Sequence, residues 1–185
     1  MYSWAQKEKF NNLPVVHSVK TIELDKRIIT DEEYEFCLNE IEKRKTLEPF
    51  KFDGSPEENL IHNTIILSAT KRFENIVKKY EEQKTKPKHE TEIHIVKIGN
   101  IAFASNQFEL YLDYQHRIQG RSPFEQTFIV QLCAQPGNKA SGSYLPTQRG
   151  EENKGYSASM YCNIVCAKGG QQLVEETVKE LKNIY

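Results

Sequence analysis

The sequence predicts an α/β fold, with α+β as the alternative, in which helices flank a mixed β-sheet. Three observations support this prediction. Two capping boxes mark helix starts, two runs of alternating apolar residues flank Gly99-Asn100, and a short apolar run occupies residues 126–134. The 185 residues are 38% hydrophobic and 28% charged, which is typical of a globular domain. We therefore expect a single domain over residues 1–185.

The first half should contain a strand and two helices. Alternating apolar residues predict a strand over 13–25. Thr30 with Glu33 forms a capping box before a helix over 31–45. Ser55, followed by Pro56 and by Glu58, predicts a second, longer helix. The residues expected on the buried stripe of that helix are Ile65, Ile66, Ala69, Phe73, Ile76, Val77 and Tyr80. The charged residues 81–90 should form a solvated connector, because Pro87 prevents continuation of the helix.

The second half should contain most of the strands. Residues 93–98 and 101–104 alternate around Gly99-Asn100, which predicts a tight hairpin. Helical spacing of apolar residues over 108–120 predicts a short helix that ends at Gly120. The apolar run over 126–134 predicts a central strand covered on both faces.

The last third mixes a loop with regular structure. Residues 135–157 are rich in Gly, Ser, Asn and Lys, which predicts an unusually long loop, and such loops tend to be either functional or disordered. A returning strand is expected over 157–165, and an amphipathic helix over 170–185.

Charge and hydropathy exclude several classes of protein. The formal net charge is -1, so neither nucleic acid nor an anionic membrane is an expected partner. The longest apolar runs are far shorter than the about 20 residues of a membrane span, and no secretory signal is visible. Cys37, Cys133, Cys162 and Cys166 are too few to demand disulfides. Reduced thiols, and hence a cytoplasmic location, fit this usage.

Candidate chemistry is sparse. Three residues follow the ends of expected strands, where active-site residues tend to converge. They are Glu109, at the expected start of the helix over 108–120, and Tyr144 and Tyr156 in the long loop. The helix dipole explains Glu109 equally well, and packing explains the two tyrosines. For Cys162 and Cys166, ordinary packing is favoured over metal binding. The five histidines lie in separate elements without HxH or HxxxH pairs, so ordinary surface positions are favoured for them.

A family resemblance favours the functional interpretation. Five stretches match in order and spacing: Ile98-Gly-Asn-Ile-Ala-Phe-Ala-Ser-Asn-Gln-Phe-Glu-Leu-Tyr-Leu-Asp-Tyr114, Arg121-Ser-Pro-Phe124, Gln126-Thr-Phe-Ile-Val130, Gly142-Ser-Tyr-Leu-Pro-Thr147 and Gly155-Tyr156. Together they resemble the C-terminal part of the catalytic domain of neutral/alkaline, non-lysosomal ceramidases. The resemblance covers residues 92–185, and residues 4–90 resemble the segment that precedes this part in the family.

The resemblance implies a zinc-dependent hydrolase that cleaves the N-acyl bond of ceramide, a sphingolipid, or of a similar acyl amide. It implies that Glu109 and Tyr144 are metal ligands and that Tyr156 hydrogen-bonds the reacting carbonyl. The family's two histidine ligands belong to the earlier half of the domain, which has no counterpart before Trp4. We therefore expect this chain to be inactive alone and to require the missing N-terminal half as its partner. Either the chain is a piece of a longer protein or a gene has lost its first half.

Departures from the family pattern leave other interpretations open. Gln107-Phe108 replaces the family's Pro-Gly before the glutamate, which suggests a divergent, bacterial-type member with a different substrate. The family includes secreted members, so the location of the parent protein is unknown. The alternative function is a non-catalytic binding or interaction module that kept the scaffold. An apolar face uncovered by the missing half would also allow homo-oligomers.

Overall fold

A mixed four-stranded sheet forms the centre of the molecule, as the predicted α/β fold requires. The computed structural model describes residues 10–47, 53–137 and 142–185. The strand order is β1-β2-β3-β5; β1 with β2 and β2 with β3 pair antiparallel, whereas β3 and β5 pair parallel. The bounds of these strands are β1 Val15–Asp25, β2 Lys88–Ile98, β3 Ile101–Ser105 and β5 Gln126–Val130. The predicted hairpin at Gly99-Asn100 is confirmed: Gly99 adopts φ +57°, a conformation that favours glycine.

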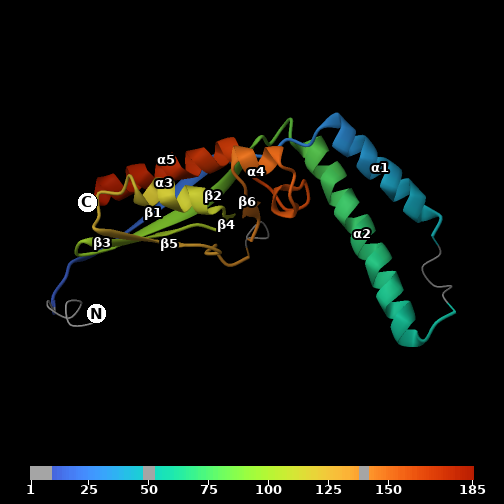
Figure 1. Cartoon of the computed structure of the whole chain (residues 1–185), viewed down its shortest axis with the longest axis horizontal. Coiled ribbons are helices and arrows are strands. Elements are labelled where there is room, and N and C mark those ends of the chain that lie inside the picture. Colours follow the sequence, from blue (N-terminus) through green and yellow to red (C-terminus); the bar gives the residue numbers. More distant parts are fainter. Residues whose placement is uncertain (1–9, 48–52, 138–141) are drawn as a thin grey trace.

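Two helices cover one face of this sheet. They are α3 (Leu112–Gln119) and the long C-terminal α5 (Ala167–Ile184), and Figure 1 shows both above the strands. Side chains of alternate strand residues and of one stripe of α5 form the main core. Its buried members are Ile22, Leu24, Ile93, Ile95, Ala102, Ala104, Phe108, Tyr114, Ile118, Phe124, Leu145, Val165, Leu173, Val174, Val178 and Leu181. We call the sheet with α3, α5 and the connecting segments after Ser105 the body.

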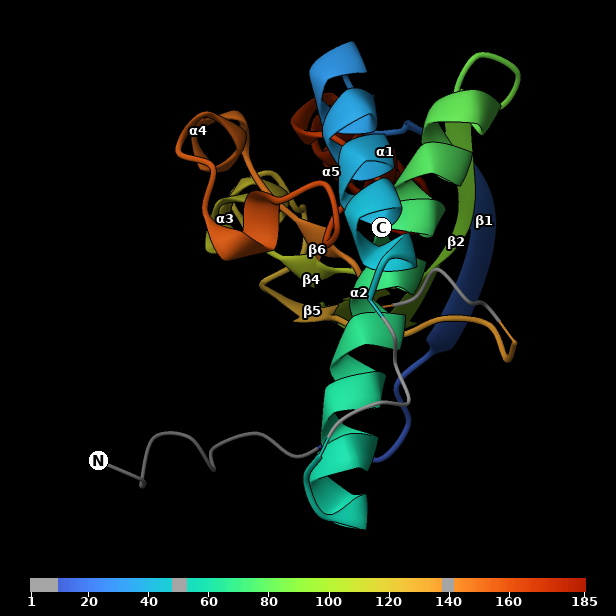
Figure 2. The ribbon, with the colours of Figure 1, turned by 90° about the vertical axis from the view of Figure 1, so that its right-hand side faces the viewer.

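The helical hairpin, α1 (Asp31–Lys45) with α2 (Pro56–Glu82), extends from one end of the body (Figures 1 and 2). Both predicted capping boxes are present, at Thr30 and at Ser55. The hairpin has a small core of its own, made of Ile29, Cys37, Phe73, Ile76 and Met160. Of the stripe expected on α2, Phe73 and Ile76 are buried, but Ile65 is exposed, because α1 and the body contact only the C-terminal part of that stripe.

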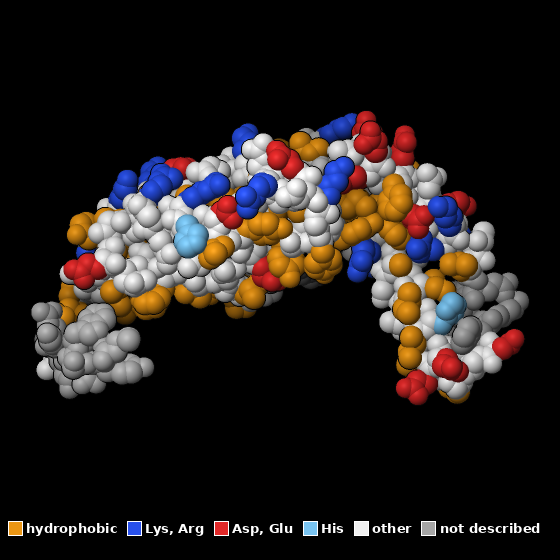
Figure 3. Space-filling view, viewed as in Figure 1, with side chains coloured by type: hydrophobic (Ala, Val, Ile, Leu, Met, Phe, Trp, Pro, Cys, Tyr) orange, Lys and Arg blue, Asp and Glu red, His pale blue; other side chains and the backbone are white. Residues whose placement is uncertain are grey.

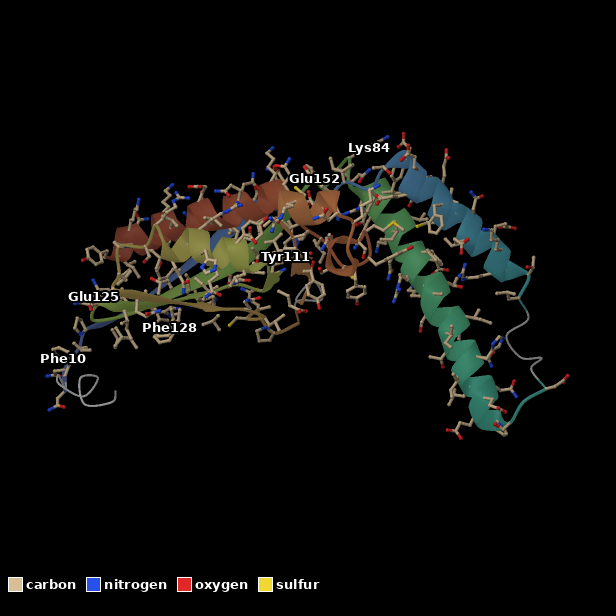
Figure 4. All side chains as sticks on the ribbon, in the orientation of Figure 1. Phe10, Lys84, Tyr111, Glu125, Phe128 and Glu152 are labelled. Carbon is tan, nitrogen blue, oxygen red and sulfur yellow. The ribbon has the colours of Figure 1, made fainter. Side chains whose placement is uncertain are left out.

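The second face of the sheet is open within the part of the chain that the structure describes. Val15, Val19, Phe128 and Val130 point to this face and are exposed. Figure 3 shows hydrophobic side chains along this underside, and Figure 4 shows Phe128 pointing below the sheet. The expectation of a central strand over 126–134 is therefore wrong: β5 lies at the edge of the described sheet, and one of its faces is uncovered.

Several other predicted boundaries need correction. The connector over 81–90 is shorter than expected, because α2 continues to Glu82 and β2 begins at Lys88, opposite Asp25 of β1. The loop over 135–157 contains β6 (Tyr144–Leu145) and α4 (Gln148–Glu152), although residues 138–141 lie outside the described part.

The expected strand over 157–165 is absent from the structure. Its place is taken by a 3-10 turn, η1 (Tyr156–Ala158), and by a single bridge between Lys26 and Val165. All four cysteines are free thiols. No helix among the described residues is long and apolar enough to cross a bilayer.

Candidate functional site

Two very short strands place the residues that the sequence singled out. β4 (Glu109–Leu110) and β6 (Tyr144–Leu145) pair in parallel, so that Glu109 lies opposite Tyr144. The backbone N–H of Glu109 donates to the carbonyl of Ser143 at 3.0 Å. The side chains of Phe108 and Leu145 are fully buried and fix the two strands to the core. Glu109 is therefore a strand residue; the expected helix start is wrong, because α3 begins only at Leu112.

The Glu109 carboxylate and the Tyr144 phenol are neighbours across the paired strands. Hydrogen bonding to this carboxylate, and its negative charge, raise the pKa of Tyr144. Glu109 and Tyr144 are both half-buried, so part of each residue is exposed to solvent. The pair thus offers two oxygen atoms of adjacent side chains to a ligand that arrives from solvent.

Tyr156 joins this pair from the next segment. Its ring centroid lies 6.1 Å from that of Tyr144, at an interplanar angle of 74°, which is an edge-to-face contact. The Tyr156 side chain is 77% exposed. A hydrogen bond with Cys162 raises the pKa of the Tyr156 phenol. Glu109, Tyr144 and Tyr156, which are far apart in the sequence, therefore form one cluster.

A buried asparagine fixes the loop that carries Tyr156. The Asn163 amide donates to the carbonyl oxygens of Tyr144 at 3.0 Å and of Ser157 at 2.7 Å, and Asn163 is only 1% exposed. Its Oδ1 atom is buried and has no partner among the described residues. Sequence reasoning missed Asn163 and interpreted Cys162 as ordinary packing, because the roles of both residues depend on a turn at 156–166 that was expected to be a loop and a strand.

A tyrosine of the α3 N-terminus supports the same loop. The Tyr111 hydroxyl hydrogen-bonds Ser157 Oγ at 2.6 Å, and Figure 4 labels Tyr111 between the strands and this turn. Ser143 Oγ donates to the carbonyl of Cys162 at 3.0 Å and accepts from the N–H of Ile164 at 3.0 Å. The cluster therefore rests on a polar network that holds its backbone in place, while its functional atoms stay accessible.

The donor set fits a metal ion only in part. A carboxylate and a phenol are suitable oxygen ligands, but the described residues contain no group of three His, Cys, Asp or Glu side chains that is arranged to hold a metal. Two of the histidines, which lie in separate elements as expected, meet across β1 and β2: His17 Nε2 lies 3.1 Å from His94 Nδ1. These two rings line a cavity of about 490 Å³ on the open sheet face, whose lining includes neither Glu109 nor Tyr144.

Comparisons of the chain with protein-family models, with curated proteins and with solved structures found no match. The functional interpretation therefore depends on the geometry of the cluster and on the motifs in the sequence.

Proposed function

We propose that this chain supplies the oxygen ligands of a zinc-dependent amide hydrolase that resembles neutral/alkaline ceramidases. In this proposal Glu109 and Tyr144 are metal ligands, and Tyr156 hydrogen-bonds the carbonyl of an acyl amide such as a ceramide-like lipid. The observation that carries the proposal is the pairing of Glu109 with Tyr144 across β4 and β6, with the Tyr156 ring packed on that of Tyr144. Bound zinc would supply polarisation of the amide carbonyl and activation of water.

The protonation state of Tyr144 controls this site. The carboxylate raises the pKa of the Tyr144 phenol, so the phenol is protonated at neutral pH. A metal ion that binds the phenol oxygen must displace its proton, and metal affinity is then coupled to pH. Zinc should therefore bind more tightly as pH rises toward that pKa, by up to about tenfold per unit.

Two oxygen ligands do not complete a zinc site. Structural zinc sites with four ligands gain about 10–16 kcal/mol, so we expect two ligands to give a Kd between about 1 μM and 1 mM. The proposed partner is a segment that resembles the N-terminal half of the family's domain and would contribute two histidines. Without it, the chain should not hydrolyse a ceramide analogue.

Zinc titration of the purified chain tests this proposal. Glu109→Ala should weaken zinc binding by at least about tenfold, because one of two ligands is lost. Glu81→Ala removes an exposed carboxylate of α2 and serves as the matched control, with unchanged affinity. Calorimetry at pH 6 and pH 8 would measure both effects. Equal zinc affinity of the Glu109→Ala variant and the native chain would contradict the assignment, as would zinc-dependent amidase activity of the chain alone.

A non-catalytic binding module is the second candidate function. The open apolar face of the sheet, with Val15, Val19 and Phe128 exposed, favours it, because such a face needs a partner surface. Zinc-independent burial of this face in a complex that has no amidase activity would support the module. Light scattering would show whether the isolated chain uses this face to form homo-oligomers instead.

A further inference from the structure

A large cavity, whose lining includes none of Glu109, Tyr144 and Tyr156, lies where the helical hairpin meets the body. Its volume is about 1060 Å³, at the upper end of the range for small-molecule sites. Its walls come from the segment that joins β1 to α1, from the ends of α2 and α4, from the turn after η1, and from the start of α5. We call it the junction cavity. Figure 4 labels Lys84 at this junction.

The floor of the junction cavity is fixed by hydrogen bonds. The Gln83 side chain accepts from the N–H of Ile29 at 2.9 Å and donates to its carbonyl at 3.1 Å. The N–H of Lys26 donates to the carbonyl of Pro87 at 3.0 Å. These bonds tie the hairpin to the strand that precedes it, so the cavity is formed before any ligand binds.

The charged groups of the cavity do not balance one another. Arg27 pairs with Glu33, and Lys168 pairs with Asp25; Glu151 accepts from the N–H of Ala167. Three lining lysines, Lys26, Lys84 and Lys154, have no ion-pair partner among the described residues, and the carboxylates of Glu32 and Glu151, which also have none there, oppose them. The unpaired groups therefore carry a surplus of positive charge.

The three lysines come from separate segments that the fold brings to one cavity. Lys154 is held with φ +51°, a left-handed conformation that costs a residue with a side chain about 1–2 kcal/mol. Lysine ammonium groups bind phosphate oxygens as point charges. Three unpaired cations against two unpaired carboxylates leave a surplus of one positive charge, which favours an anionic ligand group such as a phosphate.

Apolar side chains line the same cavity beside the lysines. Ile28 is 70% exposed, and Phe36, on the first turns of α1, is half exposed. Met160 lies at the base, in contact with the hairpin core. Exposed apolar residues next to unpaired cations are typical of sites for ligands with a charged and an apolar end.

We infer that the junction cavity binds a small organic phosphate. The phosphate group lies among Lys26, Lys84 and Lys154, and an apolar or aromatic body packs on Ile28 and Phe36. A nucleotide and a lipid phosphate share this chemistry. This phosphate site needs neither the Glu109 cluster nor zinc, so experiments can test it separately from the proposed amidase.

Calorimetric titration of the full chain with inorganic phosphate, hexyl phosphate and AMP tests the inference. Hexyl phosphate or AMP should bind at least tenfold more tightly than inorganic phosphate, because only they reach the apolar wall. Tighter binding of AMP identifies a nucleotide as the ligand, and tighter binding of hexyl phosphate identifies a lipid phosphate. Hexyltrimethylammonium, with the same chain and the opposite charge, should not bind. Equal binding of this cation, or no binding of any phosphate probe, would overturn the inference.

Two sets of variants separate the charged and apolar contributions. The triple variant Lys26→Gln, Lys84→Gln, Lys154→Gln should lose at least tenfold in affinity for the tighter probe. The control is a triple variant of lysines outside the cavity, Lys43→Gln, Lys71→Gln, Lys179→Gln, and it should change this affinity less than twofold. Lys84→Gln alone, at an exposed position, gives a smaller loss without risk to the fold. Ile28→Ser should weaken the tighter probe but leave inorganic phosphate unchanged. Native affinity in the cavity triple variant would refute the assignment.

Discussion

The helical hairpin and the body depend on opposite kinds of interaction. In the hairpin, both helix starts are fixed by local capping boxes, while its core contains five buried residues. In the body, the main core joins 16 buried residues from strands, helices and turns that are distant in the sequence. The helices of the hairpin are therefore specified by neighbouring residues but gain little stability from packing. The body is specified by contacts between distant residues and gains most of its stability from packing.

This difference predicts two levels of stability in one chain. Leu60, Ile61 and Leu67, in the N-terminal half of α2, are exposed, so that half gains little from packing. The hairpin should open in local fluctuations at a lower free energy than the body needs to unfold. Variants in the two regions should consequently give different patterns of hydrogen exchange.

The largest effect is expected for Leu24→Ala. Leu24 is completely buried in β1 and belongs to the main core, so the cavity left by truncation should cost about 4 kcal/mol of unfolding free energy. Urea unfolding measures the loss, and hydrogen exchange should accelerate throughout the body, whereas the hairpin, which exchanges through its own opening, should keep its rate. Exchange that accelerates only in β1 would contradict the idea that the body unfolds as one unit.

Phe73→Ala should have a somewhat smaller and more local effect. The Phe73 ring contacts Phe36 and Tyr161 edge-on and lies 4.7 Å from the Arg44 guanidinium carbon. Its truncation should cost about 3 kcal/mol, confined to α1 and α2. Hydrogen exchange by mass spectrometry should show faster exchange in these helices only. Equal acceleration in α5 would mean that hairpin and body unfold together.

The same contrast explains what the sequence could predict of the fold. Both hairpin helices and the β2–β3 turn follow from neighbouring residues: the Thr30 and Ser55 caps, and the Gly99-Asn100 turn. The position of β5 does not follow from neighbouring residues. A strand in the centre of a sheet and a strand at an edge with an open apolar face have the same apolar sequence pattern. Phe128 made the strand look buried, although its side chain is exposed.

The sequence predicted that the three candidate residues lie close together, but not how. Glu109, Tyr144 and Tyr156 were identified from their positions after strand ends and then from the family resemblance, and the structure brings them together. The parallel pairing of two-residue strands that unites them has no local signal, since β-strand register depends on distant partners. The contacts of Asn163 and Cys162 had no local signal either, because they form only when the turn after η1 is in place.

The smallest expected effect tests the local side of the comparison. The Thr30 hydroxyl accepts from the N–H of Glu33 at 3.2 Å, and the Glu33 carboxylate accepts from the N–H of Thr30 at 3.1 Å. Thr30→Ala removes the first of these bonds and should cost about 1 kcal/mol, seen as faster exchange in the first turns of α1. Thr64→Ala is the control: Thr64 is an exposed residue within α2 that bonds only to the Leu60 carbonyl, and alanine favours helix there. It should leave stability unchanged or slightly higher. A loss for Thr30→Ala that spread through β1–β5 would show that the capping box supports the body too, and the two regions would then share one stability.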